Sequence, residues 1–370
     1  MTELVAPSSI NLSTPPSTPK PDSQSDGKSD FEYSTFAITS LKLLLMVLAS
    51  IVSTYHSLLS SDPLLTMPVA AIESLILLLS HSPSSTISET LSLLAHYTSI
   101  LKSSVANPIA LSAGTDLFQR YLISSLQSPQ PTYPGNRGGR ARGGDTTDDF
   151  QAIRHHLISN GRLFAARAKE ARSQIAHVAR QFIGDGTTVL TYGSSRVVGA
   201  VLDAALKSDT CFKLVYVCDT TTTSTDMPPT LPSPSRELPI AIIPPSAVAH
   251  ALSQVSMVML GAEGVVENGG IISGMGTYQL GVLAKAAGKP VYVCAESHKF
   301  VRIFPLSQAD VGGVGLQFSE SAAKGQRKGS ETDEKRRIDY TPPELITALI
   351  TESGVHTPES VSEELIKIWY

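Results

Sequence analysis

One polar segment of this 370-residue sequence carries residue types that could bind a phosphate. Residues 191–196 read Thr-Tyr-Gly-Ser-Ser-Arg and join the end of an expected strand to the start of an expected helix. Backbone N–H groups at a helix start, hydroxyls and a guanidinium all donate hydrogen bonds to phosphate oxygens. Serines at this position also cap helices without any ligand. Two interpretations stay open: a plain cap, or an anion site that uses Tyr192, Gly193, Ser194, Ser195 and Arg196.

A second polar segment, residues 261–277, follows another expected strand. It contains six glycines, two carboxylates and an asparagine, more than a simple turn requires. Neither the G-x-G-x-x-G dinucleotide spacing after the first strand nor a Gly-Lys-Ser/Thr phosphate loop occurs in the sequence. We expect Glu263 to point into a crevice and accept a hydrogen bond from a ligand hydroxyl. The other candidate ligand contacts in this segment are Asn268, Gly269, Gly270 and Thr277.

A third candidate, residues 111–116, reads Leu-Ser-Ala-Gly-Thr-Asp and stands just ahead of an expected helix. Its free N–H groups could reach a ligand from the N-terminal part of the chain, through Ser112, Gly114 and Thr115. Helix capping is the alternative interpretation here as well.

The same residues offer little for catalysis. A carbonyl isomerase needs an acid and a base, or a thiol and a carboxylate, that face each other. Gly193 stands where a nucleophile would help, and we expect His250 and His298 to be structural. The cysteines are too few and too scattered for a zinc site or a disulfide framework, and we expect Cys211 and Cys218 to be buried. The sequence predicts binding without catalysis, with no catalytic residue, no metal and no cofactor.

Composition limits the class of protein. With 42% hydrophobic and 17% charged residues the chain is globular, and its length suits two domains. A net charge of −4 gives no overall basic field, so we expect no DNA partner. The N-terminus is not a signal peptide, and the apolar stretch 36–52 contains Lys42 and is too short for a membrane span. We expect a cytoplasmic protein without a membrane anchor, in which 36–52 is a buried helix.

The first half of the chain is helical in pattern. We expect a disordered tail at 1–30 and an N-terminal helical domain at 31–182, interrupted by a flexible Arg-Gly loop at 129–149. The tract at 137–144 could bind RNA or be a solvated insertion. Residues 150–182 form a clear amphipathic helix, with one apolar stripe made of Phe164, Ala168, Ala171, Ile175, Val178 and Phe182.

The second half, 183–370, alternates apolar strands with helices. Strands are expected at 187–192, 212–218, 239–243, 257–260 and 290–295, helices at 195–206, 246–254 and 277–287, and two short helices within 342–370. Continuous apolar strands that alternate with helices indicate an α/β fold with a doubly wound, Rossmann-like parallel sheet. The inserts 220–238 and 319–337 should be mobile. Ligands bind such sheets at the carboxyl ends of the strands, where the segments at 191–196 and 261–270 lie.

Several long motifs carry a family resemblance. They occupy residues 160–164, 194–198, 261–272, 294–306 and 338–342. In them the chain resembles the regulatory alpha, beta and delta subunits of translation initiation factor 2B, most of all the alpha type. The resemblance implies a homodimer formed through the C-terminal domains, which bridges an assembly with beta, gamma, delta and epsilon subunits. It also implies that this assembly exchanges guanine nucleotide on initiation factor 2 and that the chain helps to sense phosphorylation of that factor's alpha subunit.

The wider family includes ribose-1,5-bisphosphate and methylthioribose-1-phosphate isomerases, which use a cysteine and an aspartate. By motif, Gly193 and Glu263 occupy those two positions, and Gly274 replaces a lysine. The resemblance therefore implies a pocket for a sugar phosphate or a nucleoside monophosphate without turnover. Two alternatives are a residual sugar-phosphate isomerase and an RNA-binding adaptor that uses the Arg-Gly tract.

Overall fold

A computed structural model describes residues 51–62, 64–81, 86–105, 107–127, 146–218, 238–311 and 338–369. Residues 48–370 form one compact unit that contains both a helical part and a sheet part. The predicted tail at 1–30, the insert at 319–337, nearly all of the insert at 220–238 and most of the apolar stretch 36–52 lie outside the described residues. Most of the predicted Arg-Gly loop lies outside them too, but its last residues, 146–149, are helical.

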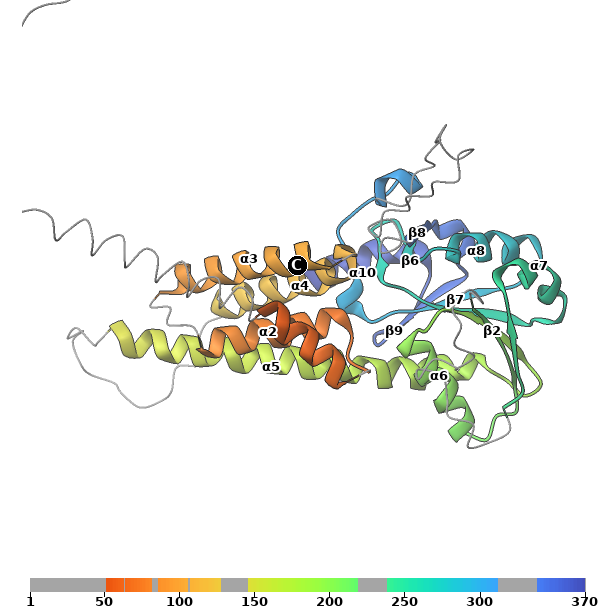
Figure 1. Cartoon of the computed structure of the whole chain (residues 1–370), viewed down its shortest axis with the longest axis horizontal. Helices are drawn as coiled ribbons and strands as arrows, with labels where there is room; N and C mark the ends of the chain where they lie inside the picture. The colour runs from red at the N-terminus through yellow and green to blue at the C-terminus, as the bar shows by residue number, and fades with distance from the viewer. Residues whose placement is uncertain are drawn as a thin grey trace, which may run out of the picture. The chain divides into compact units, whose positions relative to one another are not determined.

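The helical part packs four helices together after a helical segment at 51–61, as Figure 1 shows. Local signals set their starts: the Thr86 hydroxyl accepts a hydrogen bond from the amide of Glu89, and Asn107 accepts one from Ile109 beside Pro108, the first residue of its helix. The helices are α2 (Met67–His81), α3 (Ile87–Ser104), α4 (Pro108–Gln127) and α5 (Thr146–Ala179), which the 3-10 turn η1 (Arg180–Phe182) extends.

The sheet part is built on seven strands in the order β10-β9-β7-β4-β1-β2-β3, parallel except for β10. The strands are β1 (Thr188–Tyr192), β2 (Lys213–Val217), β3 (Ile240–Ile243), β4 (Met257–Gly261), β7 (Val291–Cys294), β9 (Ala348–Thr351) and β10 (Gly354–His356). From β1 the chain adds β2 and β3 on one side, and then β4, β7 and β9 on the other side. The topological switch point therefore lies between β1 and β4.

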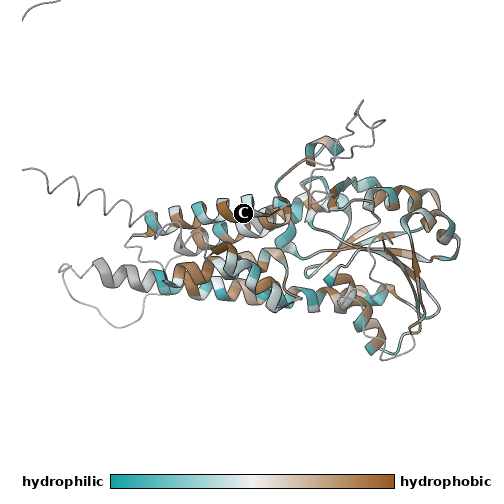
Figure 2. Ribbon diagram, viewed as in Figure 1, coloured by the Kyte–Doolittle hydropathy of each residue, from teal (hydrophilic) through white to brown (hydrophobic). Residues whose placement is uncertain are grey.

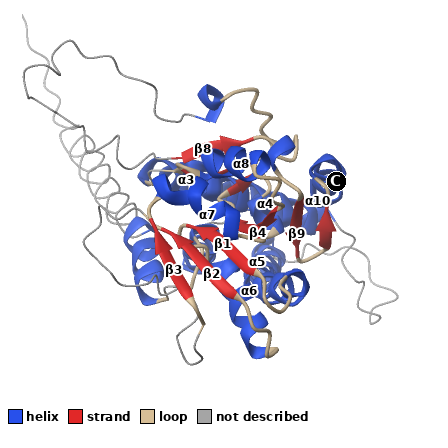
Figure 3. Ribbon diagram, turned by 90° about the vertical axis from the view of Figure 1, so that its right-hand side faces the viewer, coloured by secondary structure: helices blue, strands red, loops and turns tan. Residues whose placement is uncertain are grey.

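Helices cover both faces of this sheet, which explains the continuous apolar strands. On one face, strand residues such as Val189 pack on α6 (Arg196–Lys207) and the end of α5. On the other, strand residues such as Leu190 pack on α7 (Val248–Ala251), α8 (Thr277–Ala286) and α10 (Val361–Trp369). Figure 3 shows α6 on the side of the strands opposite α7 and α8, and in Figure 2 the strands are mostly brown, meaning hydrophobic. The predicted α/β fold class is confirmed.

A second, antiparallel sheet was not predicted. It has the order β5-β6-β8, with β5 (Gly264–Val265), β6 (Ile271–Gly274) and β8 (Ile338–Thr341). Short 3-10 turns complete the described chain: η2 (Pro245–Ala247), η3 (Leu252–Gln254), η4 (Ser297–Lys299), η5 (Gln308–Val311), η7 (Pro343–Leu345) and η8 (Pro358–Ser360).

Three local predictions were wrong. Residues 246–254 are not one helix, because 3-10 turns flank the short α7 on both sides. The end of the chain contains β9 and β10 before its single α-helix, where two helices were expected. Cys211 is exposed and Cys218 is partly buried, because both lie just outside the ends of β2. None of the helices that the structure describes is both long and apolar enough to cross a membrane.

Candidate ligand-binding site

A cavity of about 320 Å³ lies at the switch point, where β1 and β4 end. The carboxyl ends of these strands supply one wall, and the start of α2 with Ala110 of α4 supplies the facing wall. Of the sequence candidates, the structure brings six together in this cavity: Tyr192, Gly193, Ser194, Ser195, Arg196 and Glu263. The two polar segments singled out after strands therefore meet, as the fold requires.

The turn after β1 is shaped by two glycines. Gly193 has φ of 70°, a left-handed conformation that side chains rarely adopt. Gly261, at the end of β4, lies so close to the turn that an added Cβ would stand 2.1 Å from the Ser195 hydroxyl oxygen. Ser195 caps α6 by accepting a hydrogen bond from the amide of Val198 at 3.4 Å. The cap exists without a ligand, and the same hydroxyl lines the cavity.

A lysine that the sequence analysis missed supplies a cation to the cavity. The ammonium nitrogen of Lys299 lies 2.8 Å from the carboxylate of Glu296 and donates a hydrogen bond to the carbonyl oxygen of Ala262 at 3.0 Å. Lys299 belongs to η4, which follows β7, the strand beside β4. The cavity thus has a lysine although Gly274, which also lines it, stands where the resemblance expected one.

Glu263 supplies an acceptor to the cavity. Its carboxylate accepts a hydrogen bond from the side-chain amide of Asn107. Burial raises the pKa of Glu263 above its usual value, because the bond from Asn107 and the charge of Lys299 offset the lost hydration only in part. A ligand hydroxyl that donates to this carboxylate would replace some of the lost hydration.

A buried charge cluster lies behind the cavity. Glu296 is fully buried, and its other carboxylate oxygen is 4.0 Å from the Arg172 guanidinium. Burial raises the pKa of Glu296, but Lys299 and His298 outweigh burial and bring it to about 2. Burial lowers the pKa of His298 to about 4. Burial, together with Arg172, also lowers the pKa of Arg196, which lines the cavity. The cluster places positive charge beside the cavity.

The remaining sequence candidates do not line the cavity and make contacts elsewhere in the protein. Residues 111–116 were predicted just ahead of a helix, which is wrong: α4 begins at Pro108, and Thr115 donates its hydroxyl to the carbonyl oxygen of Leu111 within that helix. Gly114 and Ser112 lie in the same helix, where Ser112 donates to Asp116. Their amides take part in helix hydrogen bonds, so they do not form the expected anion site.

The turn at 268–270 was also expected at the ligand. The side-chain amide of Asn268 donates to the Tyr340 hydroxyl at 2.6 Å, and its oxygen accepts from the amide of Gly270 at 3.0 Å. Gly269 has φ of 84° and packs against the backbone of Pro358. Thr277 is buried at the start of α8 and donates to the carbonyl oxygen of Gly274 at 2.7 Å. These four residues brace the loop and do not line the cavity.

The groups that line the cavity match the chemistry of an anionic polyol. Ser194, Arg196 and Lys299 supply donors and positive charge for a phosphate, and Glu263 supplies an acceptor for a hydroxyl. No cysteine, histidine or aspartate is among the described residues that line it. In the part of the chain that the structure describes, no three His, Cys, Asp or Glu side chains are placed to hold a metal ion.

Comparison with known proteins identifies the family. The model of the initiation factor 2 subunit family matches residues 61–358. The chain belongs to the initiation factor 2 subunit family. A family member from Caenorhabditis elegans, translation initiation factor eIF2B subunit alpha, is 31% identical over 88% of this chain and 100% of its own length. The subunit alpha of Dictyostelium discoideum is 36% identical over 60% of this chain and 71% of its own length.

Other similar proteins are more distant. The eIF2B subunit delta of Dictyostelium discoideum is 28% identical over 57% of this chain and 36% of its own length. The tetrameric eIF2B-beta2-delta2 complex of C. thermophilum contains a chain with a TM-score of 0.62 and 18% identity, covering 86% of this chain and 94% of that one. Translation initiation factor eIF-2B of Pyrococcus horikoshii has a TM-score of 0.55 at 18% identity, covering 79% of this chain and 90% of that one. The alpha-type resemblance of the motifs is confirmed, and the solved structures share the fold.

Proposed function

We propose that this chain is a non-catalytic regulatory subunit of the assembly that exchanges guanine nucleotide on translation initiation factor 2. The observation that carries the proposal is the match to the alpha subunit of Caenorhabditis elegans, which extends over that whole protein. In this proposal the chain assembles with beta, gamma, delta and epsilon subunits in the cytoplasm. It helps to sense phosphorylation of the alpha subunit of initiation factor 2, the signal of the integrated stress response, and the exchange chemistry belongs to other subunits.

Co-purification from cell extract tests this assembly. The tagged full chain should capture the other subunits of initiation factor 2B, and it should retain more initiation factor 2 when the alpha subunit of that factor is phosphorylated. A matched extract treated with phosphatase is the control. Capture of initiation factor 2 that is equal in both extracts would contradict the sensing role, and failure to capture the other subunits would contradict the assembly itself.

We infer that the chain forms a homodimer through its sheet part. Large apolar side chains are exposed together on the loop before η5, where Ile303, Phe304 and Leu306 are 38%, 61% and 84% exposed. A cluster of exposed apolar side chains is typical of a protein–protein contact. Sedimentation velocity should give a dimer, and Phe304→Asp combined with Leu306→Asp should shift it toward the monomer. A monomer for the unchanged chain would contradict the homodimer.

We further propose that the cavity at the switch point binds a phosphorylated sugar or a nucleoside monophosphate. The start of α6, Arg196 and Lys299 favour the phosphate, and Glu263 favours a hydroxyl. A ligand that binds only the folded chain raises its melting temperature. Hexose phosphates should therefore stabilise the wild type and not Arg196→Ala, while Arg162→Ala, an exposed arginine outside the cavity, should respond as wild type. No shift with any hexose phosphate or nucleotide would contradict ligand binding.

The sugar-phosphate isomerase remains the alternative function. Gly193 offers no nucleophile to a ligand in the cavity, and the Glu263 carboxylate is engaged by Asn107. We therefore expect no ketose from ribose 1,5-bisphosphate or methylthioribose 1-phosphate, and detecting that product would overturn the non-catalytic role. The Arg-Gly tract lies outside the described residues. Deleting 135–144 and measuring RNA affinity tests the adaptor function.

A further inference from the structure

A second and larger cavity lies on the other side of η4. It has a volume of about 650 Å³, is open to solvent, and is lined by α4, α5, η4, α10 and the turn between β9 and β10. Cavities of about 300–1,000 Å³ are the usual size for small organic ligands. None of its lining residues lines the cavity at the switch point. A ligand here would therefore occupy a site separate from the one proposed above.

The helical wall of this cavity carries an apolar and aromatic patch among polar side chains. Leu117 of α4 and Ala168 of α5 are nearly buried, and Phe164 of α5 lines the cavity with them. The Phe164 ring is held by two other rings, with centroid distances of 5.8 Å to Phe118 and 5.5 Å to Tyr121. A rigid aromatic surface that faces a cavity is suited to a flat ring, because stacked and tilted ring pairs gain contact without loss of side-chain freedom.

The polar groups of the cavity include one that lacks a partner. His298 is 3% exposed, and its Nε2 atom has no hydrogen-bond partner among the described residues. A buried ring nitrogen without a partner is costly, and a ligand atom would supply the partner once the ring turns Nε2 toward the cavity. Because burial lowers the pKa of His298 to about 4, the ring is neutral near pH 7 and can donate one N–H.

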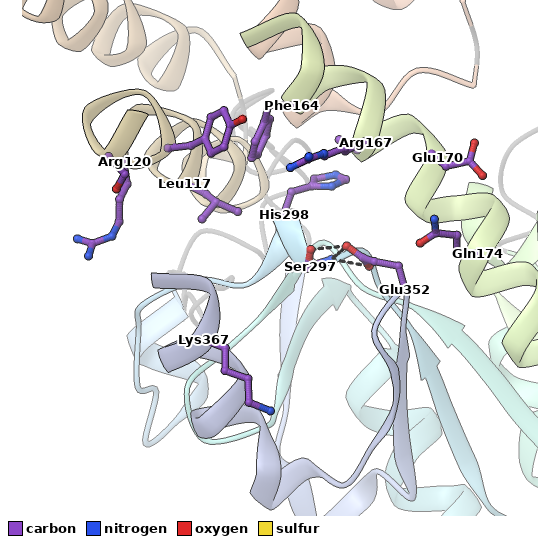
Figure 4. Close-up of a pocket in the computed structure, with 13 residues that line it drawn as sticks. Leu117, Arg120, Phe164, Arg167, Glu170, Gln174, Ser297, His298, Glu352 and Lys367 are labelled. Atoms are coloured by element: carbon purple, nitrogen blue, oxygen red, sulfur yellow. Dashed lines mark hydrogen bonds between the residues drawn. The ribbon is translucent and has the colours of Figure 1, made fainter. Parts of the chain in front are cut away.

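Arg167 supplies a cation beside this ring. Figure 4 shows its side chain extending from α5 toward His298 and Phe164. Within the described part of the chain Arg167 makes no ion pair or hydrogen bond. The acidic groups of the cavity are Glu170 and Glu352, and Glu352 is engaged at the far side, where its carboxylate accepts hydrogen bonds from the amide and hydroxyl of Ser297. Lys367 pairs with Glu364 at 2.6 Å.

We propose that this cavity binds a small organic anion with a flat aromatic ring. The ring packs on Phe164 and Leu117, and the anionic group accepts hydrogen bonds from the Arg167 guanidinium and from His298 in the tautomer protonated at Nε2. An anion between two donors replaces the missing partner of His298 and gives Arg167 a counter-charge. An uncharged ring of the same size would gain only the apolar contact.

Fluorescence titration of the full chain tests the site with two related probes. The first is 8-anilino-1-naphthalenesulfonate, an aromatic anion, and the second is N-phenyl-1-naphthylamine, which lacks the sulfonate. The sulfonate should bind saturably to the wild type and about tenfold more weakly to Arg167→Gln, the effect of one lost charge-assisted hydrogen bond. Arg162→Gln is the matched control, because Arg162 is exposed on the same helix and does not line the cavity.

The uncharged probe separates charge from contact. Its affinity should be lower than that of the sulfonate in the wild type, unchanged in Arg167→Gln, and reduced in Phe164→Ala. Arg167 is exposed and has no partner among the described residues, so its replacement should leave the melting temperature unchanged. Equal affinity of the sulfonate for wild type and Arg167→Gln, or no saturable binding by the wild type, would overturn the proposal.

Discussion

Glu296→Gln removes the negative charge from the buried cluster behind the first cavity, and we expect it to lower the free energy of unfolding by about 3 kcal/mol at pH 7. The magnitude follows from the pKa of Glu296, about 2 against a usual 4.5, at about 1.4 kcal/mol for each unit. Burial alone would raise this pKa, so the ion pair with Lys299 and the proximity of His298 must supply the gain. Glutamine would leave Lys299 and Arg172 without their shared counter-charge.

The sign of the pH dependence is fixed by the direction of this shift. An acid with a lowered pKa in the folded state adds stability above its unfolded pKa and loses it as the pH falls through its folded value. For Glu296 the contribution is complete above about pH 4.5 and is lost toward pH 2. The difference between wild type and Glu296→Gln should therefore be the same at pH 7 and pH 5, and fall to less than half at pH 3.

Glu263→Gln is the matched control, because Glu263 also lies near Lys299. Burial raises the pKa of Glu263, so its charge opposes folding near neutral pH, and glutamine keeps an oxygen for Asn107. We expect no loss of stability. Urea unfolding followed by circular dichroism, at one fixed protein concentration, measures both variants. A Glu296→Gln variant within 1 kcal/mol (about a third of the expected loss) of wild type, or an equal loss in Glu263→Gln, would refute the reasoning.

Three further predictions concern packing, capping and pH. Gly261→Ala should lower stability by about 1–3 kcal/mol, because its Cβ would stand 2.1 Å from the Ser195 hydroxyl oxygen. Gly274→Ala is the control, because no atom lies within 4 Å of the added Cβ, and thermal unfolding compares the two variants. Thr86→Ala should cost about 1 kcal/mol by removing the cap of α3, measured by urea unfolding, with Thr187→Ala as a hydroxyl that caps no helix. As the pH is lowered, the unfolded chain takes up a proton at His298 before the folded chain does. Stability should therefore decrease as the pH falls from about 6.5 to 4. His298→Gln should flatten that part of the plot of melting temperature against pH.

The strands buried on both faces could be predicted from the sequence almost to the residue. Strands β1, β2, β4 and β7 are continuous apolar runs that alternate with helices, the pattern of a doubly wound parallel sheet, and the edge strand β3 was found from its short apolar run although its side chains are not buried. The strands β9 and β10 were missed because the three apolar residues at 348–350, a few residues ahead of Gly354, fit a short helix equally well. The strands β6 and β8 of the small sheet lie far apart in sequence, as their pair Ile272 and Tyr340 shows, so a local pattern cannot reveal that they pair.

The part of the site that is built from segments after parallel strands could be predicted from the sequence, and the part that comes from the helices could not. The segments at 191–196 and 261–263 follow strands, and a parallel sheet places such segments at one edge. Lys299 follows β7 in a polar run and could have been found by extending that rule to the next strand. Asn107 and Thr66 come from the helical part, and their approach depends on packing that no spacing reveals. Gly114 was predicted at the ligand because its segment was expected just ahead of a helix, but it lies inside α4, where an added Cβ would stand 2.5 Å from the side chain of Pro68.

Nucleotide exchange measured with and without this chain tests the central claim most directly. The release of labelled GDP from initiation factor 2 would be followed with the assembled exchange complex, prepared with and without the chain, on phosphorylated and unphosphorylated factor. A regulatory subunit predicts that the complex without the chain still catalyses GDP release and is inhibited less by the phosphorylated factor. Inhibition that is unchanged without the chain would contradict the regulatory role, and loss of all exchange activity would contradict the assignment of the chemistry to other subunits.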